Sequence, residues 1–150
     1  MAREDNRLYS AVQGMGKAVA TEVTTDDLIS VVDDDPSVRE GLTDLLASLG
    51  YPAAVFASAE AFLASGAPAV TACLITDGRM SGMGGLELFH QLTAAGLRIP
   101  TILITAFPSA TERSRAMQDG MHCYLPKPCN ERELLGCLRS AVASRRAHRP

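Results

Sequence analysis

The sequence predicts a three-layer α/β fold, a doubly wound parallel sheet with helices on both of its faces. Two observations carry this prediction. Short apolar runs rich in Val and Ile alternate five times with longer amphipathic segments. The connections between them are short and contain Gly, Pro, Ser, Asn and Asp, the residues of turns and helix ends. Right-handed crossovers between parallel strands then leave only a few topologies.

Five runs are predicted to be strands. The first, Leu28 to Val32, is almost wholly apolar, as expected for a strand buried on both faces. The other predicted strands are Ala53 to Phe56, Ala72 to Thr76, Pro100 to Thr105 and Met121 to Leu125.

Each predicted strand is followed by a predicted helix, and four of the five helices begin at a recognisable cap. The capping residues are Asp35 with Pro36, Ser58, Ser109 with Glu112 in capping-box spacing, and Asn130 with Glu133. The remaining helix, Gly85 to Ala95, is predicted to end at Gly96.

Composition indicates one soluble domain of ordinary character. The chain has 150 residues, 47% hydrophobic and 21% charged, with a formal net charge of -3, which gives no reason to expect nucleic-acid binding. No apolar run approaches the roughly 18 residues of a membrane span. We expect residues 1–26 to be a flexible extension, residues 27–144 to be the folded domain and residues 145–150 to be a basic tail.

The four cysteines are predicted to be reduced and mostly buried, as in a cytosolic protein. No pair has CxxC spacing, so disulfide and metal interpretations are both weak. A metal site at His122, Cys123 and Cys129 is the less favoured alternative; the other two cysteines are Cys73 and Cys137.

Polar residues follow four of the five predicted strands, at the edge where open α/β sheets bind ligands. Acidic residues 33–35 follow the first strand, Asp77 the third, Thr105 ends the fourth and Lys127 follows the fifth. Singly, each could be a cap, a strand residue or a surface residue. Together they predict a functional site.

This set of side chains suits phosphoryl transfer to a carboxylate. Two carboxylates about 4 Å apart repel by roughly 4 kcal/mol at an effective dielectric constant of 20, so Asp33, Asp34 and Asp77 need cationic neighbours. Mg²⁺ prefers such oxygen ligands, and Lys127 supplies a second positive charge. The Thr105 hydroxyl can donate to a phosphoryl oxygen.

In four motifs the sequence resembles the receiver domain of bacterial response regulators in two-component systems, particularly the class with LuxR-type DNA-binding outputs. The resemblance covers about Leu28 to Val142 and implies the flavodoxin-like strand order 2-1-3-4-5. The motifs are Val31-Val32-Asp33-Asp34-Asp35-Pro36, Asp77-Gly78-Arg79-Met80 with Gly85, Ile104-Thr105-Ala106, and Tyr124-Leu125-Pro126-Lys127-Pro128.

The resemblance assigns a role to each residue of the site. It implies that Asp77 is the phosphoacceptor and that Tyr124 is the switch aromatic, whose ring turns inward on phosphorylation. It also implies a cis bond between Lys127 and Pro128. The implied Mg²⁺ ligands are Asp34 directly, Asp33 largely through water, Asp77, and the backbone carbonyl of Arg79; Thr105 and Lys127 would hold the phosphoryl oxygens.

The resemblance also implies a signalling role rather than a metabolic enzyme. We expect a stand-alone, cytoplasmic response regulator that takes its phosphoryl group from a histidine kinase or phosphotransfer protein. It would relay the signal to a protein target through its fourth helix, last strand and last helix. No membrane or direct nucleic-acid contact is implied, and a homodimer through the last helix is possible.

The loop after the acceptor departs from the family pattern. Gly78 stands where an apolar residue is usual, and Ser81 where Pro is usual. With Gly82, Gly84 and Gly85 nearby, we expect unusual backbone freedom and a less rigid metal site.

Three alternatives compete with this interpretation. A haloacid-dehalogenase-like phosphatase would use the D-x-D spacing of residues 33–35 with Thr105 and Lys127, but would leave Asp77 without a role. A flavodoxin-like FMN module needs a phosphate-binding loop where this chain is acidic. The third alternative is a receiver fold that serves as a constitutive interaction module without phosphorylation.

Overall fold

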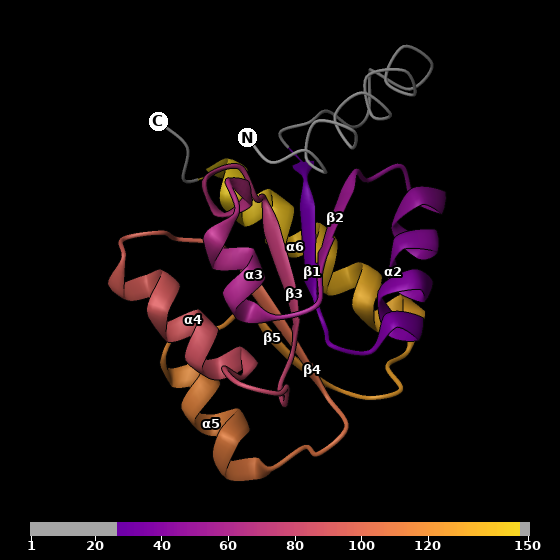
Figure 1. Ribbon diagram of the computed structural model, residues 1–150. Coiled ribbons are helices and arrows are strands. Elements are labelled where there is room, and N and C mark those ends of the chain that lie inside the picture. The colour runs from indigo at the N-terminus through magenta and orange to yellow at the C-terminus, as the bar shows by residue number, and fades with distance from the viewer. Residues whose placement is uncertain (1–26, 148–150) are drawn as a thin grey trace.

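The computed structural model, which describes residues 27–147, contains one five-stranded parallel sheet (Figure 1). Its strand order, β2-β1-β3-β4-β5, confirms the predicted topology. The predicted extension at residues 1–26 lies outside the described residues. The strands are β1 (Ile29–Val32), β2 (Ala53–Phe56), β3 (Cys73–Asp77), β4 (Thr101–Thr105) and β5 (Cys123–Pro126).

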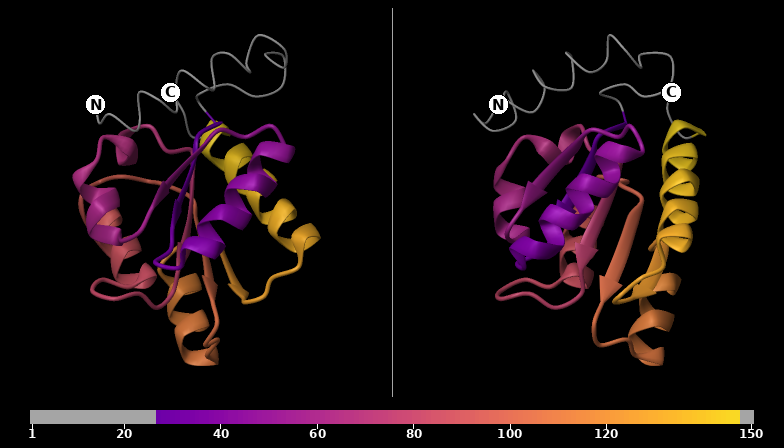
Figure 2. Two further views of the ribbon diagram at one scale, coloured as in Figure 1. Left: turned by 45° about the vertical axis from the view of Figure 1, so that its right-hand side comes forward. Right: turned by 90° about the vertical axis from the view of Figure 1, so that its right-hand side faces the viewer.

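Helices cover both faces of the sheet, which confirms the three layers (Figure 2). Helices α2 and α6 pack on one face, and α3, α4 and α5 pack on the other. The helices are α2 (Pro36–Ser48), α3 (Ala59–Ala64), α4 (Gly85–Ala94), α5 (Ala110–Gln118) and α6 (Glu131–Ala147), with a short 3-10 helix, η2 (Ala67–Ala69).

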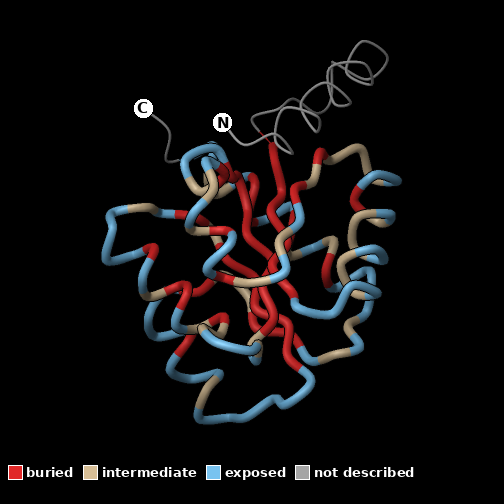
Figure 3. Tube along the Cα trace, in the orientation of Figure 1, coloured by how far each residue is buried: buried red, intermediate tan, exposed pale blue. Residues whose placement is uncertain are grey.

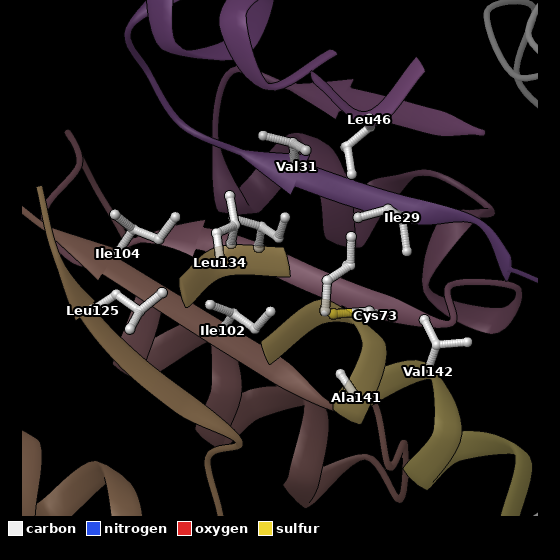
Figure 4. Packing of buried hydrophobic residues seen from close by; sticks show 12 residues of the cluster. Ile29, Val31, Leu46, Cys73, Ile102, Ile104, Leu125, Leu134, Ala141 and Val142 are labelled. Atoms are coloured by element: carbon white, nitrogen blue, oxygen red, sulfur yellow. The ribbon is translucent and has the colours of Figure 1, made fainter. Parts of the chain in front are cut away.

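The central strands are buried on both faces (Figure 3). This agrees with their sequences, in which polar and apolar residues do not alternate. On the α6 side, Ile29 and Ile102 of the sheet pack with Leu134 and Leu138 of the helix, all at most 2% exposed (Figure 4). Full burial of such a side chain contributes about 1.5–3 kcal/mol. This packing fixes the strand ends, and with them the side chains that follow.

Side-chain caps start the helices where the sequence predicts them. The Asp35 carboxylate accepts from the backbone N–H of Ser37 at 2.9 Å, and the Ser58 hydroxyl accepts from that of Ala61 at 3.0 Å. The Asn130 side chain accepts from two N–H groups at the start of α6. These bonds satisfy donors that have no partner within the helix.

Helix α6 continues through Arg145 and Arg146, which we placed in the basic tail. Arg146 forms an ion pair with Asp27, whose side chain is 2% exposed. The end of the last helix is therefore tied to the residues that lead into β1.

The prediction of reduced cysteines is wrong for one pair, because the structure contains a disulfide between Cys123 and Cys137. Strand β5 and helix α6 bring the two Cα atoms to 6.4 Å, within the usual range for disulfides. The bond also removes Cys123 from the less favoured metal site. Cys73 and Cys129 are free, and burial raises the pKa of the Cys73 thiol well above its ordinary value.

One glycine is required where α4 begins against the end of β3. A Cβ atom on Gly85 would collide with the backbone carbonyl oxygen of Asp77 and lie 3.0 Å from Cγ2 of Thr76. A side chain at this position would push the helix away from the strand that carries Asp77.

We expect Gly85→Ala to lower the free energy of unfolding by about 1–3 kcal/mol, because the opposing atom is rigid backbone. Gly136→Ala in α6 is the matched control, since a Cβ there meets nothing within 4 Å. The control should gain up to about 1 kcal/mol from helix propensity. Urea denaturation measures both, and equal stability of the two variants would contradict the close approach at Gly85.

Candidate functional site

Three carboxylates gather at the carboxyl edge of the sheet, as predicted. Asp33 and Asp34 follow β1, and Asp77 is the last residue of β3. One oxygen from each lies within 4.8 Å of the others. Within residues 27–147, this is the only cluster of three or more His, Cys, Asp or Glu side chains placed to ligate a metal ion.

Asp77 is held in a nearly buried position, 7% exposed, opposite Ile104 on the neighbouring strand β4. Burial, and next the carboxylate of Asp33, raise the pKa of Asp77 above its ordinary value, and Lys127 opposes this effect. A carboxylate in this position attracts cations and carries a negative charge that is incompletely solvated.

Lys127 bridges two of the three carboxylates. Its Nζ lies 2.9 Å from Oδ2 of Asp33 and 3.4 Å from Oδ1 of Asp77. Burial disfavours its ammonium group, but these two carboxylates outweigh that effect and raise the pKa of Lys127. Lys127 therefore stays protonated. Its backbone N–H donates to the Thr105 carbonyl at 2.7 Å. The peptide bond between Lys127 and Pro128 is cis, as the resemblance implied.

Three hydrogen bonds from backbone N–H groups to carboxylates hold the loop after Asp77. Backbone N–H groups donate from Arg79 to Asp77 Oδ1 at 3.4 Å, from Ser81 to Asp34 Oδ2 at 3.3 Å, and from Met83 to a carboxylate oxygen of Glu60 in α3 at 3.1 Å. Gly82 in this loop has a positive φ of 81°, a conformation that favours glycine, and the reduced rigidity of the metal site stays a prediction.

Gly78 serves close packing rather than an unusual backbone conformation. A Cβ atom at Gly78 would lie 3.0 Å from Cβ of Thr105 and 3.1 Å from Cδ2 of Leu103. The backbone after the acceptor thus contacts the side chain of Thr105 directly. The sequence shows that residue 78 has no side chain, but not that Thr105 and Leu103 occupy the space beside it.

The donor set fits Mg²⁺, which prefers oxygen ligands and needs only one or two carboxylates from the protein. The side chains of Asp33, Asp34 and Asp77 are placed to hold it. The Arg79 backbone adjoins them, and its carbonyl stays the predicted fourth ligand. No structural zinc or iron site fits here, since those metals favour sulfur or nitrogen donors.

Thr105 lies at the end of β4, 1% exposed, and its hydroxyl accepts from the backbone N–H of Phe107 at 3.0 Å. The Arg79 guanidinium carbon lies 4.3 Å from the centre of the Phe107 ring. This cation–π contact joins the loops that follow Asp77 and Thr105. No sequence pattern indicated that Arg79 and Phe107 stack.

Tyr124 is buried, with 4% of its surface exposed. Its hydroxyl donates to a carboxylate oxygen of Glu112 at 2.6 Å and accepts from the backbone N–H of Ser109 at 3.1 Å. The Ser109 hydroxyl accepts from the N–H of Glu112, which is the predicted first half of a capping box. In a complete capping box the Glu112 carboxylate would also accept from the backbone N–H of Ser109. Here the Tyr124 hydroxyl accepts from that N–H and donates to Glu112, so it bridges the two groups.

This fold and site define a class of α/β domain with three carboxylates and a lysine at the carboxyl edge of its sheet, and comparison with known proteins identifies the family. The family model of the response regulator receiver domain matches residues 29–139, so the chain belongs to that family. It is not a metabolic enzyme, and the phosphatase and FMN-module alternatives are excluded.

Similar curated proteins are longer than this chain. The chain is 37% identical over 134 residues to nodulation protein W of Bradyrhizobium diazoefficiens, covering 89% of this chain and 59% of that protein. It is 36% identical over 114 residues to the transcriptional regulatory protein FixJ of Azorhizobium caulinodans, covering 76% and 54%. The chain thus spans little more than half the length of these relatives.

Solved structures agree in fold. The response regulator StyR is 43% identical, with a TM-score of 0.74 over 81% of this chain and 63% of that chain. The structure titled FixJ-N is 33% identical, with a TM-score of 0.71 over 78% and 94%. The relation to LuxR-type outputs stays a prediction. In the part of the chain that the structure describes, none of the helices has the length and apolar character needed to cross a membrane.

The tyrosine in the capping box can be tested by a double-mutant cycle with Glu112→Ala and Tyr124→Phe. We expect a coupling energy of about 1 kcal/mol in the free energy of unfolding, because the two changes remove the same charge-assisted hydrogen bond. Pairing Tyr124→Phe with Glu87→Ala, an acidic residue of α4, serves as the control cycle and should give no coupling. Additive effects in the first cycle would show that the Glu112 contact adds nothing to stability.

Proposed function

We propose that this domain accepts a phosphoryl group on Asp77 and relays a signal by changing the surface formed by α5, β5 and α6. The observation that carries the proposal is the convergence of Asp33, Asp34 and Asp77 with the ammonium group of Lys127 in one pocket. The donor would be a histidine kinase, a phosphotransfer protein or a small acyl phosphate, since family membership supports such partners.

Each side chain has a task in the proposed transfer. The Asp77 carboxylate attacks phosphorus in line and forms an acyl phosphate, while the bond between phosphorus and the donor breaks and the donor's imidazole nitrogen or carboxylate oxygen leaves with the electron pair. Mg²⁺, held by Asp33, Asp34, Asp77 and the Arg79 carbonyl, would supply charge neutralisation at the phosphoryl oxygens. Lys127 provides a second cation at the same place, and the Thr105 hydroxyl donates to a phosphoryl oxygen. Positioning and electrostatics therefore supply most of the rate enhancement.

The proposed relay starts at Thr105. Its hydroxyl oxygen accepts from the N–H of Phe107, and its proton is available to donate to a phosphoryl oxygen, so movement of the hydroxyl toward Asp77 would weaken the Phe107 bond. Tyr124 lies on the next strand, and its hydroxyl contacts the start of α5. Phosphorylation would favour an inward position of the Tyr124 ring. A partner that prefers this surface can shift the population only by its differential affinity for the two arrangements.

Several further expectations rest on this function. We propose a cytoplasmic location, where kinases transfer phosphoryl groups, and a protein target, with no direct nucleic-acid contact by this domain. Self-association through α6 is compatible with the proposal. Stand-alone action stays a prediction, since the relatives extend beyond the matched part. The constitutive interaction module is the second candidate, favoured by the departures at Gly78 and Ser81.

The phosphoacceptor is tested by incubation with acetyl phosphate and Mg²⁺, followed by intact-mass measurement. We expect the mass of one phosphoryl group on the wild type, none on Asp77→Asn, and none when EDTA removes the metal. Lys127→Ala should slow labelling by about tenfold or more, since it removes one preorganised cation. Arg139→Ala, on the surface of α6, is the charge-matched control. Labelling of Asp77→Asn would refute the acceptor, and an unlabelled wild type would favour the constitutive module.

The relay is tested with Thr105→Ala, which keeps Asp77 and its cationic neighbours. We expect it to accept the phosphoryl group but to lose most of the change in amide hydrogen exchange that phosphorylation causes in α5 and β5. Thr93→Ala, on the surface of α4, should behave as the wild type. A full exchange response in Thr105→Ala would disprove the relay while leaving the acceptor assignment intact.

A further inference from the structure

Helix α6 is joined to the edge strand β5 by two contacts on one helical face. The disulfide links Cys123 to Cys137, and directly beside it the His122 ring nitrogen Nε2 lies 2.9 Å from the Ser140 hydroxyl. Residues three apart on a helix are neighbours on its surface, so both contacts hold the same side of α6. His122, just before β5, and Cys123, the first residue of β5, thus both contact this helix.

We propose that Cys123 and Cys137 are a reversible redox modification site, oxidised by low-molecular-weight disulfides and reduced by thiols. In a reducing cytoplasm a protein disulfide is usually transient rather than permanent. The reversibility of the disulfide in the cell therefore rests on the cytoplasmic location proposed above. Oxidation would clamp α6 to β5 covalently, and reduction would leave the apolar packing between them and the hydrogen bond from His122.

Incomplete burial distinguishes this pair from a bridge in the middle of the core. Cys123 and Cys137 are both only partly buried, and β5 is an outer strand of the sheet. Cys73, by contrast, is fully buried and its raised pKa keeps it a thiol. Cys129 is partly buried and packs against the same apolar cluster as the pair, but it has no disulfide partner.

The exchange is balanced with glutathione disulfide as the oxidant. One cysteine thiolate attacks a sulfur of glutathione disulfide, which forms a mixed disulfide and releases one glutathione thiolate. The second cysteine thiolate attacks the protein sulfur of that mixed disulfide, which forms the Cys123–Cys137 bond and releases a second glutathione thiolate. The two protons lost by the cysteines are taken up by the released thiolates. The His122 contact keeps α6 beside β5 in the reduced form, so the bond can form again.

The wild-type protein is equilibrated with reduced and oxidised glutathione at a series of ratios, alkylated with N-ethylmaleimide, and mapped by peptide mass spectrometry. We expect Cys123 and Cys137 to lose reactivity together, in one linked peptide, while Cys129 stays alkylated at every ratio. Reducing the folded protein with dithiothreitol should lower its Tm by several degrees. Cys129→Ser should show the same shift, and Cys137→Ser should show none.

Two results would overturn the proposal. If Cys123 and Cys137 are alkylated independently at every glutathione ratio, they do not form a redox pair. If the bond resists excess dithiothreitol in the folded protein, it is a permanent structural link rather than a switch. Both results come from the wild type and need no variant to fold. Neither depends on whether Asp77 accepts a phosphoryl group.

Discussion

The ion pair between Lys127 and the carboxylates of Asp33 and Asp77 is the interaction on which the site depends. It joins residues 94 positions apart in the sequence, so it exists only when β1, β3 and β5 are in place. Two carboxylates about 4 Å apart repel by roughly 4 kcal/mol at an effective dielectric constant of 20. Without the ammonium group this charge would oppose folding of the very edge that carries the acceptor. The sheet brings the carboxylates together, and the positive charge of Lys127 offsets the repulsion between them.

Strand β5 carries Lys127 at its carboxyl end, and the rest of the strand connects that end to two helices. Tyr124 reaches across to the start of α5, where its hydroxyl completes the cap, and Cys123 reaches to α6 on the opposite face. Successive strand residues point to opposite faces, so one short strand contacts both layers. Strand β5 therefore connects the position of Lys127 to helices in both layers. The relay that we propose through α5, β5 and α6 would use these contacts.

The parts of the molecule that the sequence predicted are those that local chemistry determines. Caps such as Asp35 and Ser58 act within four residues, and the end of a buried strand places Asp77 at the edge of the sheet whatever the packing around it. The misses are contacts between segments distant in sequence. The Cys123–Cys137 bond has no spacing signal, because it depends on the register of α6 against β5. The tyrosine in the capping box was hidden for the same reason: the spacing of Ser109 and Glu112 predicts their mutual bonds, not a third residue between them.

Gly78 illustrates how such a hidden contact can matter for function. Family resemblance marked it as a departure, and conformational freedom was the simplest explanation from sequence. The structure instead places its backbone directly against Thr105, where a Cβ would come within 3.0 Å of the threonine side chain. Arg79, the next residue, stacks on Phe107, two residues beyond Thr105. The loop that would complete the metal site and the strand end that would sense the phosphoryl group are thus in contact at two successive positions. If phosphorylation draws Thr105 toward Asp77, as we propose, the loop after Asp77 would have to move with it, because the two segments pack together at both positions.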